Sequence, residues 1–365
     1  MKFLSEYRDG DLAKRLLDEI ASIVTKPWSI MEVCGGQTHS LVKHGILDLL
    51  PSEVNMIHGP GCPVCVTPVH LIDKAIHLAE EKGVILCSYG DMLRVPGAQK
   101  SLLDSKASGA DIRILYSPLE AVEIAISNPD NEVVFFAVGF ETTAPANAMS
   151  VLQAEAAGVS NYSILTSHVL VPPAIEAVMN DEECNIDAFL AAGHVCTIMG
   201  ISEYEPLVNN YKMPIVVTGF EPIDLLQGIL MVVKQLESGS TDLENQYSRV
   251  VRTEGNLKAI EMINKVFEIK DRVWRGIGNI PESGYEIKAK YAAYDANIKF
   301  DVDIPDSPEN EECIAGQVLK GIKKPKDCPQ FAKKCKPEFP LGAPMVSSEG
   351  ACAAYYHFSQ AAQAV

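Results

Sequence analysis

The sequence contains no run of about 18 uncharged apolar residues, the length that a membrane-spanning helix requires. It also lacks the apolar segment of a signal peptide, because the charged residues Lys2 and Glu6 come before such a segment can begin. From these two absences we expect a cytoplasmic protein that has no membrane partner.

Basic residues are too few for a protein that binds nucleic acid. The chain has 31 lysines and arginines against 48 acidic residues, and this formal net charge of -17 would repel a phosphate backbone. Lysines cluster only at 320–326 and 333–336, where they lie among cysteines. We therefore expect no nucleic acid partner.

Three common catalytic motifs are absent as well. There is no G-x-x-x-x-G-K-[ST], no strand followed by G-x-G-x-x-G, and no H-E-x-x-H. Nucleotide hydrolysis, dinucleotide-dependent reduction and zinc proteolysis therefore lack their usual local signatures.

The chain does have enough apolar material for two or three domain cores, with 365 residues of which 47% are hydrophobic. Up to about residue 240, apolar β-rich runs alternate with helical patterns, which is typical of parallel sheets covered on both faces by helices. Strands are expected near 28–33, 54–58, 84–88, 112–116, 133–138, 162–167 and 214–218. Helices are expected near 4–24, 69–81, 119–126, 146–157 and 223–236.

The predicted fold class is α/β, with two parallel-sheet units flanking a cleft and a smaller C-terminal module. The triplet Gly-Phe-Glu follows an apolar strand twice, which favours two units, and its glutamates Glu141 and Glu221 are interpreted as first-turn helix carboxylates. A turn sequence at 128–131 suggests the boundary between the units. A helix at 256–269, an irregular stretch from Gly276 and a cysteine-rich tail follow. The predicted units are residues 1–130, 131–240 and 241–365.

Four of the ten cysteines lie in the tail, separated by 14, 6 and 16 residues: Cys313, Cys328, Cys335 and Cys352. In a reducing compartment, grouped cysteines are better interpreted as metal ligands or redox centres than as disulfides. Four thiolates can hold zinc or a [4Fe–4S] cluster, and the ligand bonds would replace the missing apolar core. Structural zinc sites usually use close cysteine pairs, which this segment lacks, so the spacing favours a [4Fe–4S] cluster.

A second group of cysteines lies near the N-terminus. Cys62 and Cys65 form a C-x-x-C between a strand and a helix, where the helix dipole lowers a thiol pKa and favours redox chemistry. Cys34 also follows a strand, and loops at the carboxyl ends of parallel strands converge on one crevice. Three thiolates there suit a soft metal such as iron, with His39 as a proton donor or supporting partner.

The remaining cysteines occur singly. Cys87 and Cys196 are expected to be small core residues, and Cys184 is expected to be exposed among acidic residues. His194 is most simply a core histidine with its hydrogen bonds satisfied.

Four motifs resemble the signatures of the HypD family of [NiFe]-hydrogenase maturation factors, in order and over essentially the whole chain. They are C-G-G-Q-T-H at 34–39, G-P-G-C-P-V-C at 59–65, G-F-E-T-T-A-P at 139–145 and S-S-E-G-A-C at 347–352. The resemblance implies a protein that helps to build the Fe(CN)2CO group, together with a small HypC-type chaperone and a HypE-type cyanide carrier.

The resemblance also implies roles for individual residues. Cys34 would ligate the assembling iron, and Cys62 and Cys65 would supply or relay electrons during cyanide attachment. The four tail cysteines would hold a [4Fe–4S] cluster. His39, His194 and Glu349 match polar positions that are important in the family.

Two other functions are kept open. A thiol-disulfide oxidoreductase similar to ferredoxin-thioredoxin reductase would use the C-x-x-C and a cluster but would not need Cys34. A structural zinc protein that serves as an interaction scaffold would use the tail cysteines alone.

Overall fold

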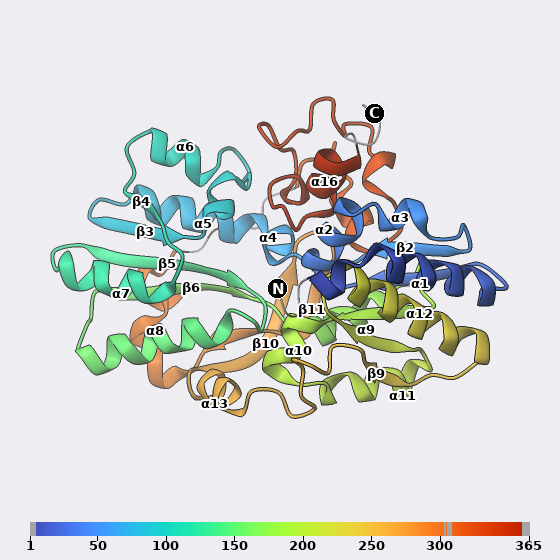
Figure 1. Cartoon of the computed structure of the whole chain (residues 1–365). Coiled ribbons are helices and arrows are strands. Elements are labelled where there is room, and N and C mark those ends of the chain that lie inside the picture. Colours follow the sequence, from blue (N-terminus) through green and yellow to red (C-terminus); the bar gives the residue numbers. More distant parts are fainter. Residues whose placement is uncertain (1–4, 303, 305–308, 360–365) are drawn as a thin grey trace.

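The computed structural model describes residues 5–302, 304 and 309–359, and it contains two parallel sheets side by side (Figure 1). The first, sheet A, has the strand order β2-β1-β7-β8-β9. Its strands are β1 (Trp28–Glu32), β2 (Val54–His58), β7 (Ala188–Ala192), β8 (Ile215–Thr218) and β9 (Leu243–Asn245), all parallel. The predicted α/β class is therefore confirmed.

The second, sheet B, has the order β4-β3-β5-β6 and is also parallel throughout. It comprises β3 (Val84–Ser88), β4 (Ile112–Ile114), β5 (Glu132–Gly139) and β6 (Tyr162–His168). Every residue of β3 is buried, and so is every residue of β5 except the first, as expected for a sheet covered on both faces.

The predicted division at residue 130 does not coincide with the division between the sheets, because β4 and β5 are members of the same sheet. The chain begins sheet A with β1 and β2, builds all of sheet B, and then returns to sheet A at β7. No strand was predicted at β7, because its alanine-rich sequence has low β propensity. Its five residues are buried between β1 and β8, so packing rather than propensity fixes the strand.

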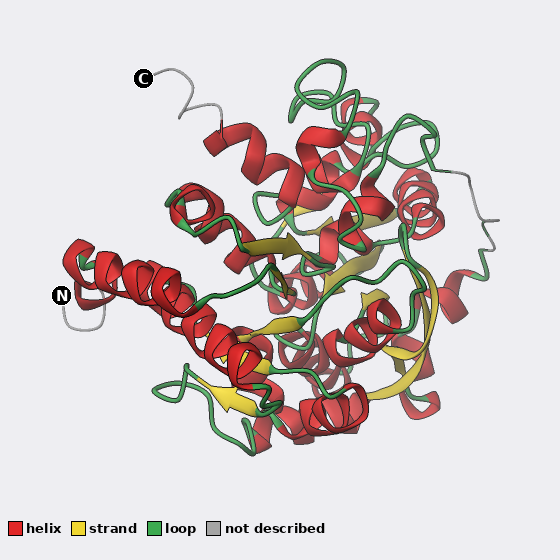
Figure 2. Cartoon of the chain, turned by 90° about the vertical axis from the view of Figure 1, so that its right-hand side faces the viewer, coloured by secondary structure: helices red, strands yellow, loops and turns green. Residues whose placement is uncertain are grey.

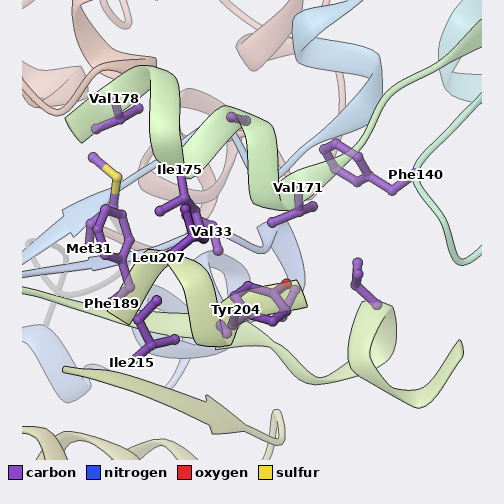
Figure 3. Close-up of a cluster of buried hydrophobic side chains, with 14 of the residues drawn as sticks. Met31, Val33, Phe140, Val171, Ile175, Val178, Phe189, Tyr204, Leu207 and Ile215 are labelled. Carbon is purple, nitrogen blue, oxygen red and sulfur yellow. The ribbon is translucent and has the colours of Figure 1, made fainter. Parts of the chain in front are cut away.

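Helices cover both faces of both sheets, and Figure 2 shows them enclosing the strands. One face of sheet A packs on α1 (Gly10–Ile23), α2 (Gly35–Lys43), α3 (Ile46–Leu49) and α12 (Pro222–Ser238). The other face packs on α9 (Val171–Met179), α10 (Gly193–Met199) and α11 (Glu205–Tyr211). In Figure 3, Ile175 and Val178 of α9 lie above strand residues Met31 and Phe189, and Val171 lies near Phe140.

Sheet B is covered in the same way by α5 (Val69–Glu80), η2 (Gly90–Arg94) and α6 (Leu102–Ala107) on one face. Its other face packs on α7 (Pro118–Ser127), α8 (Ala144–Ala157) and α13 (Leu257–Val266). The predicted first helix is interrupted: η1 (Ser5–Arg8) ends before Asp9, whose side chain caps α1. Its expected start at Leu4 lies outside the described residues.

The predicted third module, 241–365, differs most from the structure. Strand β9 completes sheet A, and β11 (Gly278–Ile287) forms within the stretch expected to be irregular. It pairs in an antiparallel hairpin with β10 (Phe267–Trp274), so the helix predicted at 256–269 ends earlier, at Val266. This hairpin packs against β6 and α9. After α14 (Ala296–Phe300), the cysteine-rich segment runs through α15 (Ala315–Leu319), η5 (Pro325–Asp327), η6 (Ala343–Met345), α16 (Ala351–Ala354) and η7 (Tyr355–Ser359). This segment lies beside α2 at the top of Figure 1.

Among residues 5–302, 304 and 309–359, the helices are all too short or too polar to cross a membrane.

Candidate functional site

The carboxyl edge of sheet A brings together residues that are far apart in the sequence. Its strand order, β2-β1-β7-β8, places four consecutive loops in a row. Cys62 and Cys65 follow β2, Cys34 follows β1, His194 follows β7 and Phe220 follows β8. The strand order therefore explains how distant motifs reach one site.

Cys34 and the C-x-x-C lie in adjoining loops that are held together by their backbones. The N–H of Gly35 donates to the carbonyl of Gly61 at 2.7 Å, and a Cβ at Gly61 would collide with the backbone of Cys34. Each loop ends in a helix N-cap, Cys34 for α2 and Cys62 for α4 (Pro63–Val66). Cys62 and Cys65 are both buried and form a disulfide with their Cα atoms 5.2 Å apart. The predicted trio thus occupies one edge of sheet A.

The tail supplies the other wall of this crevice. A Cβ at Gly35 would collide with the backbone and Cβ of Glu349, so α2 and the residues before α16 are in direct contact. His39 Nδ1 lies 3.1 Å from the carbonyl oxygen of Ser348, and its ring meets Phe358 edge-on at 5.0 Å. His39 and Glu349 therefore lie at the same interface between α2 and the tail.

The environment of Cys34 opposes its ionisation. Burial raises the pKa of the Cys34 thiol, and the carboxylate of Glu349 raises it further, while the backbone N–H groups of Gly36 and Gln37 act in the opposite direction. Burial and the nearby Asp91 raise the pKa of Glu349 itself. Without a cation, Cys34 is therefore a thiol near neutral pH, and a bound metal would have to displace its proton.

Replacing Glu349 by glutamine should make Cys34 more reactive. Removing the neighbouring negative charge lowers the pKa of the thiol, so at pH 8 the thiolate fraction and the rate of alkylation by iodoacetamide should rise about three- to tenfold. The rate is measured by mass spectrometry of the Cys34 peptide. Asp91→Asn is the matched control, and an equal rise in that variant would show that Glu349 has no specific effect on Cys34.

His194 lines a pocket next to the start of α2, the helix that Cys34 caps. Its ring stacks on Phe220 with the centroids 3.8 Å apart, and Phe220 in turn fills the space next to Gly36. His194 is exposed, so its interpretation as a core histidine was wrong. The pocket, of about 430 Å³, is lined by His194, Phe220, Glu221, Asp224, Tyr247, Arg249 and Val250.

A buried hydrogen-bond network of Glu32, His58 and Tyr355 lies behind Cys34 and was not predicted from the sequence. Glu32 is fully buried; its carboxylate accepts the Cys34 N–H at 3.0 Å and the Thr38 hydroxyl, and lies 2.7 Å from His58 Nδ1. His58 Nε2 lies 3.0 Å from the hydroxyl of Tyr355, which belongs to η7. A chain of contacts thus runs from the tail to the backbone of Cys34. Its signal in the sequence was a glutamate and a histidine at the ends of two buried strands.

The network should contribute measurably to stability. Tyr355→Phe removes one buried hydrogen bond and should lower the free energy of unfolding by about 1 kcal/mol. His58→Ala leaves the buried Glu32 carboxylate without its ring partner and should cost about 3–5 kcal/mol. Urea denaturation followed by circular dichroism measures both. Tyr356→Phe, next in the chain, is the control, and a loss as large as that of Tyr355→Phe would contradict this interpretation.

The four tail cysteines line one small cavity. Its other walls come from the same segment: Ile314, Ala315, Val318, Phe331, Gly342, Pro344 and Met345. All four thiols are free. Burial raises the pKa of the Cys352 thiol, and the three neighbouring thiols raise it further. The Leu341 N–H donates to Cys335 Sγ at 3.4 Å, and a Cβ at Gly342 would collide with Cys313 Sγ.

This donor set suits a metal group with four thiolate ligands. A shared cation stabilises neighbouring thiolates that otherwise oppose each other's ionisation. Hydrogen bonds from N–H groups to sulfur are among the contacts that set the reduction potential of iron–sulfur clusters. No group of three or more His, Cys, Asp or Glu side chains is arranged to ligate one metal ion in the part of the chain that the structure describes. The four cysteines share the lining of one cavity.

The cavity and the C-x-x-C are separated by a single short element, η6. Pro344 and Met345 of η6 line the cavity, and Ala343 packs in the same apolar cluster as Val64 between the two C-x-x-C cysteines. The buried Arg275 also contacts both sites. Its backbone N–H donates to the Val66 carbonyl at 2.8 Å, and the charge of its side chain lowers the pKa of the Cys313 thiol. The tail is therefore packed against the crevice.

The remaining sequence expectations have mixed outcomes. Cys87 and Cys196 are fully buried, as predicted, whereas Cys184 is half-buried against the core of sheet A, so its predicted exposure was wrong. Glu221 caps α12, but Glu141 precedes α8 and is not in its first turn. Glu141 is fully buried, accepts the Val171 N–H at 2.9 Å, and has its pKa raised to about 8 by burial.

Residues 11–359 match the family model described as "HypD: Hydrogenase formation hypA family". The chain is 46% identical over 374 residues to "Hydrogenase maturation factor HypD" of Azotobacter vinelandii, an alignment that covers 100% of this chain and 99% of that protein. It is 47% identical over 373 residues to the Rhodobacter capsulatus protein of the same name and 43% identical over 368 residues to that of Escherichia coli. Each of these two alignments covers 99% of both proteins.

Proposed function

Because this chain belongs to the HypD family of hydrogenase maturation factors, we propose that it is the redox-active scaffold on which the Fe(CN)2CO group of a [NiFe] hydrogenase is assembled. One observation carries the proposal: Cys34, the Cys62–Cys65 disulfide and the tail meet at the carboxyl edge of sheet A. A metal ligand and a two-electron thiol pair in one crevice are what assembly of a cyanide-bearing iron group requires.

In this proposal Cys34 ligates the iron, which is the cargo of the protein. Its Sγ stands at the N-terminus of α2, where the N–H groups of Gly36 and Gln37 favour the thiolate once a cation has displaced the proton. Glu349 and His39, at the edge of the same crevice, are placed to receive that proton and to orient the incoming ligand.

Cys62 and Cys65 supply the electrons that release cyanide from a thiocyanate-type carrier. The reduced pair gives two electrons and two protons to R–S–CN, whose S–C bond breaks; the products are the Cys62–Cys65 disulfide, R–SH and HCN. The disulfide form of the pair is then the spent state, which must be reduced before the next cyanide.

Cys313, Cys328, Cys335 and Cys352 would hold a [4Fe–4S] cluster, which when bound supplies the electrons for that reduction one at a time. The short separation through η6 and Val64 supports this role, because electron transfer requires close approach. The four thiols around a shared space suit a polynuclear cluster better than a single zinc ion, which draws its ligands to one point.

Two partners complete the proposal, and the assembly works in the cytoplasm. A small HypC-type chaperone would supply a further cysteine ligand to the iron, and a HypE-type carrier would deliver cyanide. The pocket around His194 and Phe220 adjoins Gly36 and is open to solvent, so it can accept the carrier's reactive end beside Cys34.

The proposal is tested by anaerobic copurification of the chain with a HypC-type chaperone, followed by incubation with a cyanide-loaded HypE-type carrier. Infrared spectroscopy should show bands of iron-bound cyanide that comigrate with the complex. A complex that binds iron and oxidises its thiols but never acquires iron-bound cyanide would contradict the scaffold function.

The Cys62–Cys65 disulfide beside a four-cysteine cavity also favours a second candidate, a thiol-disulfide oxidoreductase similar to ferredoxin-thioredoxin reductase. That function makes no use of Cys34, so a Cys34 variant separates the two.

A further inference from the structure

The segment that carries the tail cysteines has a charge opposite to that of the rest of the chain. Between residues 313 and 341 there are seven lysines against one aspartate and one glutamate, although the whole chain has a net charge of -17. The lysines are Lys320, Lys323, Lys324, Lys326, Lys333, Lys334 and Lys336. Neither the ligation of iron nor the release of cyanide uses them.

Five of these lysines, from Lys323 to Lys334, are exposed, while Lys320 and Lys336 are half-buried. Lys320 pairs with Asp181 at 2.8 Å and Lys334 with Glu312 at 2.8 Å, so two of the seven charges are neutralised locally. Most of the positive charge therefore faces solvent around a single segment.

Two of the exposed lysines are close in sequence to cysteines that line the cavity. Lys326 lies two residues before Cys328, and Lys333 lies two residues before Cys335, and both of these cysteines line the cavity. Cys328 itself is half-exposed. Any metal group in the cavity is thus close to a surface that carries positive charge.

An exposed aromatic ring follows these lysines in the same segment. Phe339 is 76% exposed at the tip of a turn closed by backbone hydrogen bonds between Lys336 and Phe339. The turn borders a cavity of about 900 Å³ whose charged lining includes Arg94, Lys100 and Arg275 as well as acidic residues. A large exposed apolar side chain within a charged rim is the usual anatomy of a transient protein interface.

We propose that residues 323–339, with Lys326, Lys333 and Phe339 at the centre of the contact, are the docking surface for a small acidic one-electron carrier of the ferredoxin class. This inference rests on the proposed function, in which the four cysteines hold a [4Fe–4S] cluster. One electron leaves the reduced iron–sulfur centre of the carrier and enters the centre held by the cysteines; no bond forms or breaks, and no proton moves. Charge complementarity speeds such encounters and makes them sensitive to salt.

A simpler role for the lysines would be to balance the negative charge of a thiolate-bound cluster. That role needs no partner, so a loss of lysines would alter the cluster itself and leave the affinity for a carrier unchanged. A docking role predicts the reverse pattern, and binding therefore has to be measured separately from cluster content.

The test uses the full chain and a recombinant [2Fe–2S] ferredoxin of strongly negative net charge. Isothermal titration calorimetry at 25 mM and 250 mM NaCl compares the wild type with the double variant Lys326→Glu/Lys333→Glu. The matched control is Lys258→Glu/Lys265→Glu on α13, which makes the same change in charge at two exposed lysines at the opposite end of the molecule in Figure 1. Iron and sulfide are assayed in all three proteins.

We expect micromolar binding at low salt, weakened about tenfold or more by 250 mM NaCl and about tenfold by the tail variant, with the control within about twofold of wild type. Equal affinities for the tail and control variants, or no binding by the wild type, would overturn the docking surface and leave the scaffold function intact. A wild type without iron and sulfide would instead overturn the cluster on which the function rests.

Discussion

A Cys34→Ala variant should fold normally and retain its tail cluster, yet support less than about 1% of wild-type hydrogenase maturation. The substitution deletes the one thiol that stands free in the crevice, because Cys62 and Cys65 are joined to each other. No other sulfur occupies the N-cap of α2, so the iron loses its protein ligand. The measurement is hydrogenase activity in a bacterial strain whose own maturation factor has been deleted, alongside the iron content of the purified complex with the chaperone.

Cys184→Ala is the matched control, since Cys184 is also a half-buried free thiol but precedes β7, at the amino edge of sheet A, whereas the crevice lies at the carboxyl edge. It should leave maturation within about twofold of wild type. If Cys34→Ala matured hydrogenase as well as this control and still reduced protein disulfides, the scaffold function would be wrong and the thiol-disulfide oxidoreductase would take its place.

The second large effect is expected from Cys328→Ala. The anaerobically purified wild type should be brown and contain about four iron and four sulfide per chain, the content of one [4Fe–4S] cluster. The variant should lose nearly all of both, because three thiolates leave one iron without a protein ligand and the segment has little apolar core to hold it in shape. Metal analysis and the visible absorption spectrum measure the loss.

Cys87→Ala provides the comparison, because Cys87 is a fully buried free thiol in β3 that should cost stability but no iron. Stoichiometric zinc without sulfide in the wild type and in the Cys87 variant would falsify the cluster and favour a structural zinc scaffold.

The sequence predicted the regular elements of the fold well where pattern and propensity agree. The apolar β-rich runs at 54–58 and 84–88 form strands with the predicted bounds. The strand β7 was missed because alanine is a weak strand former, and this strand exists only because β1 and β8 enclose it. The hairpin β10–β11 was missed because β10 is largely exposed and because Pro281 and two glycines interrupt the apolar pattern of β11.

The sequence predicted that three cysteines of the candidate site share one crevice, but it did not predict the residues that support them. Cysteines with a functional role can be recognised from their spacing and their place after apolar runs. Cys34, Cys62 and Cys65 were therefore assigned to the loops that follow two predicted strands. The network of Glu32, His58 and Tyr355 depends on the pairing of β1 with β2 and on the docking of the tail, neither of which local sequence encodes. Residues whose role depends on a neighbour that is distant in the sequence have no local sequence pattern by which they could be predicted.

The path of the chain through the two sheets also governs the order in which they can form. The four strands of sheet B lie between residues 84 and 168, so they can pair with one another while the later part of the chain is still being synthesised, and α13 covers one face of this sheet afterwards. Strand β1 must wait for β7, which pairs with it across the long excursion through sheet B, and the crevice must wait longer still for Glu349. The crevice around Cys34 is therefore completed late, and on the proposed function an unfinished chain on the ribosome has no finished site at which to accept its cargo.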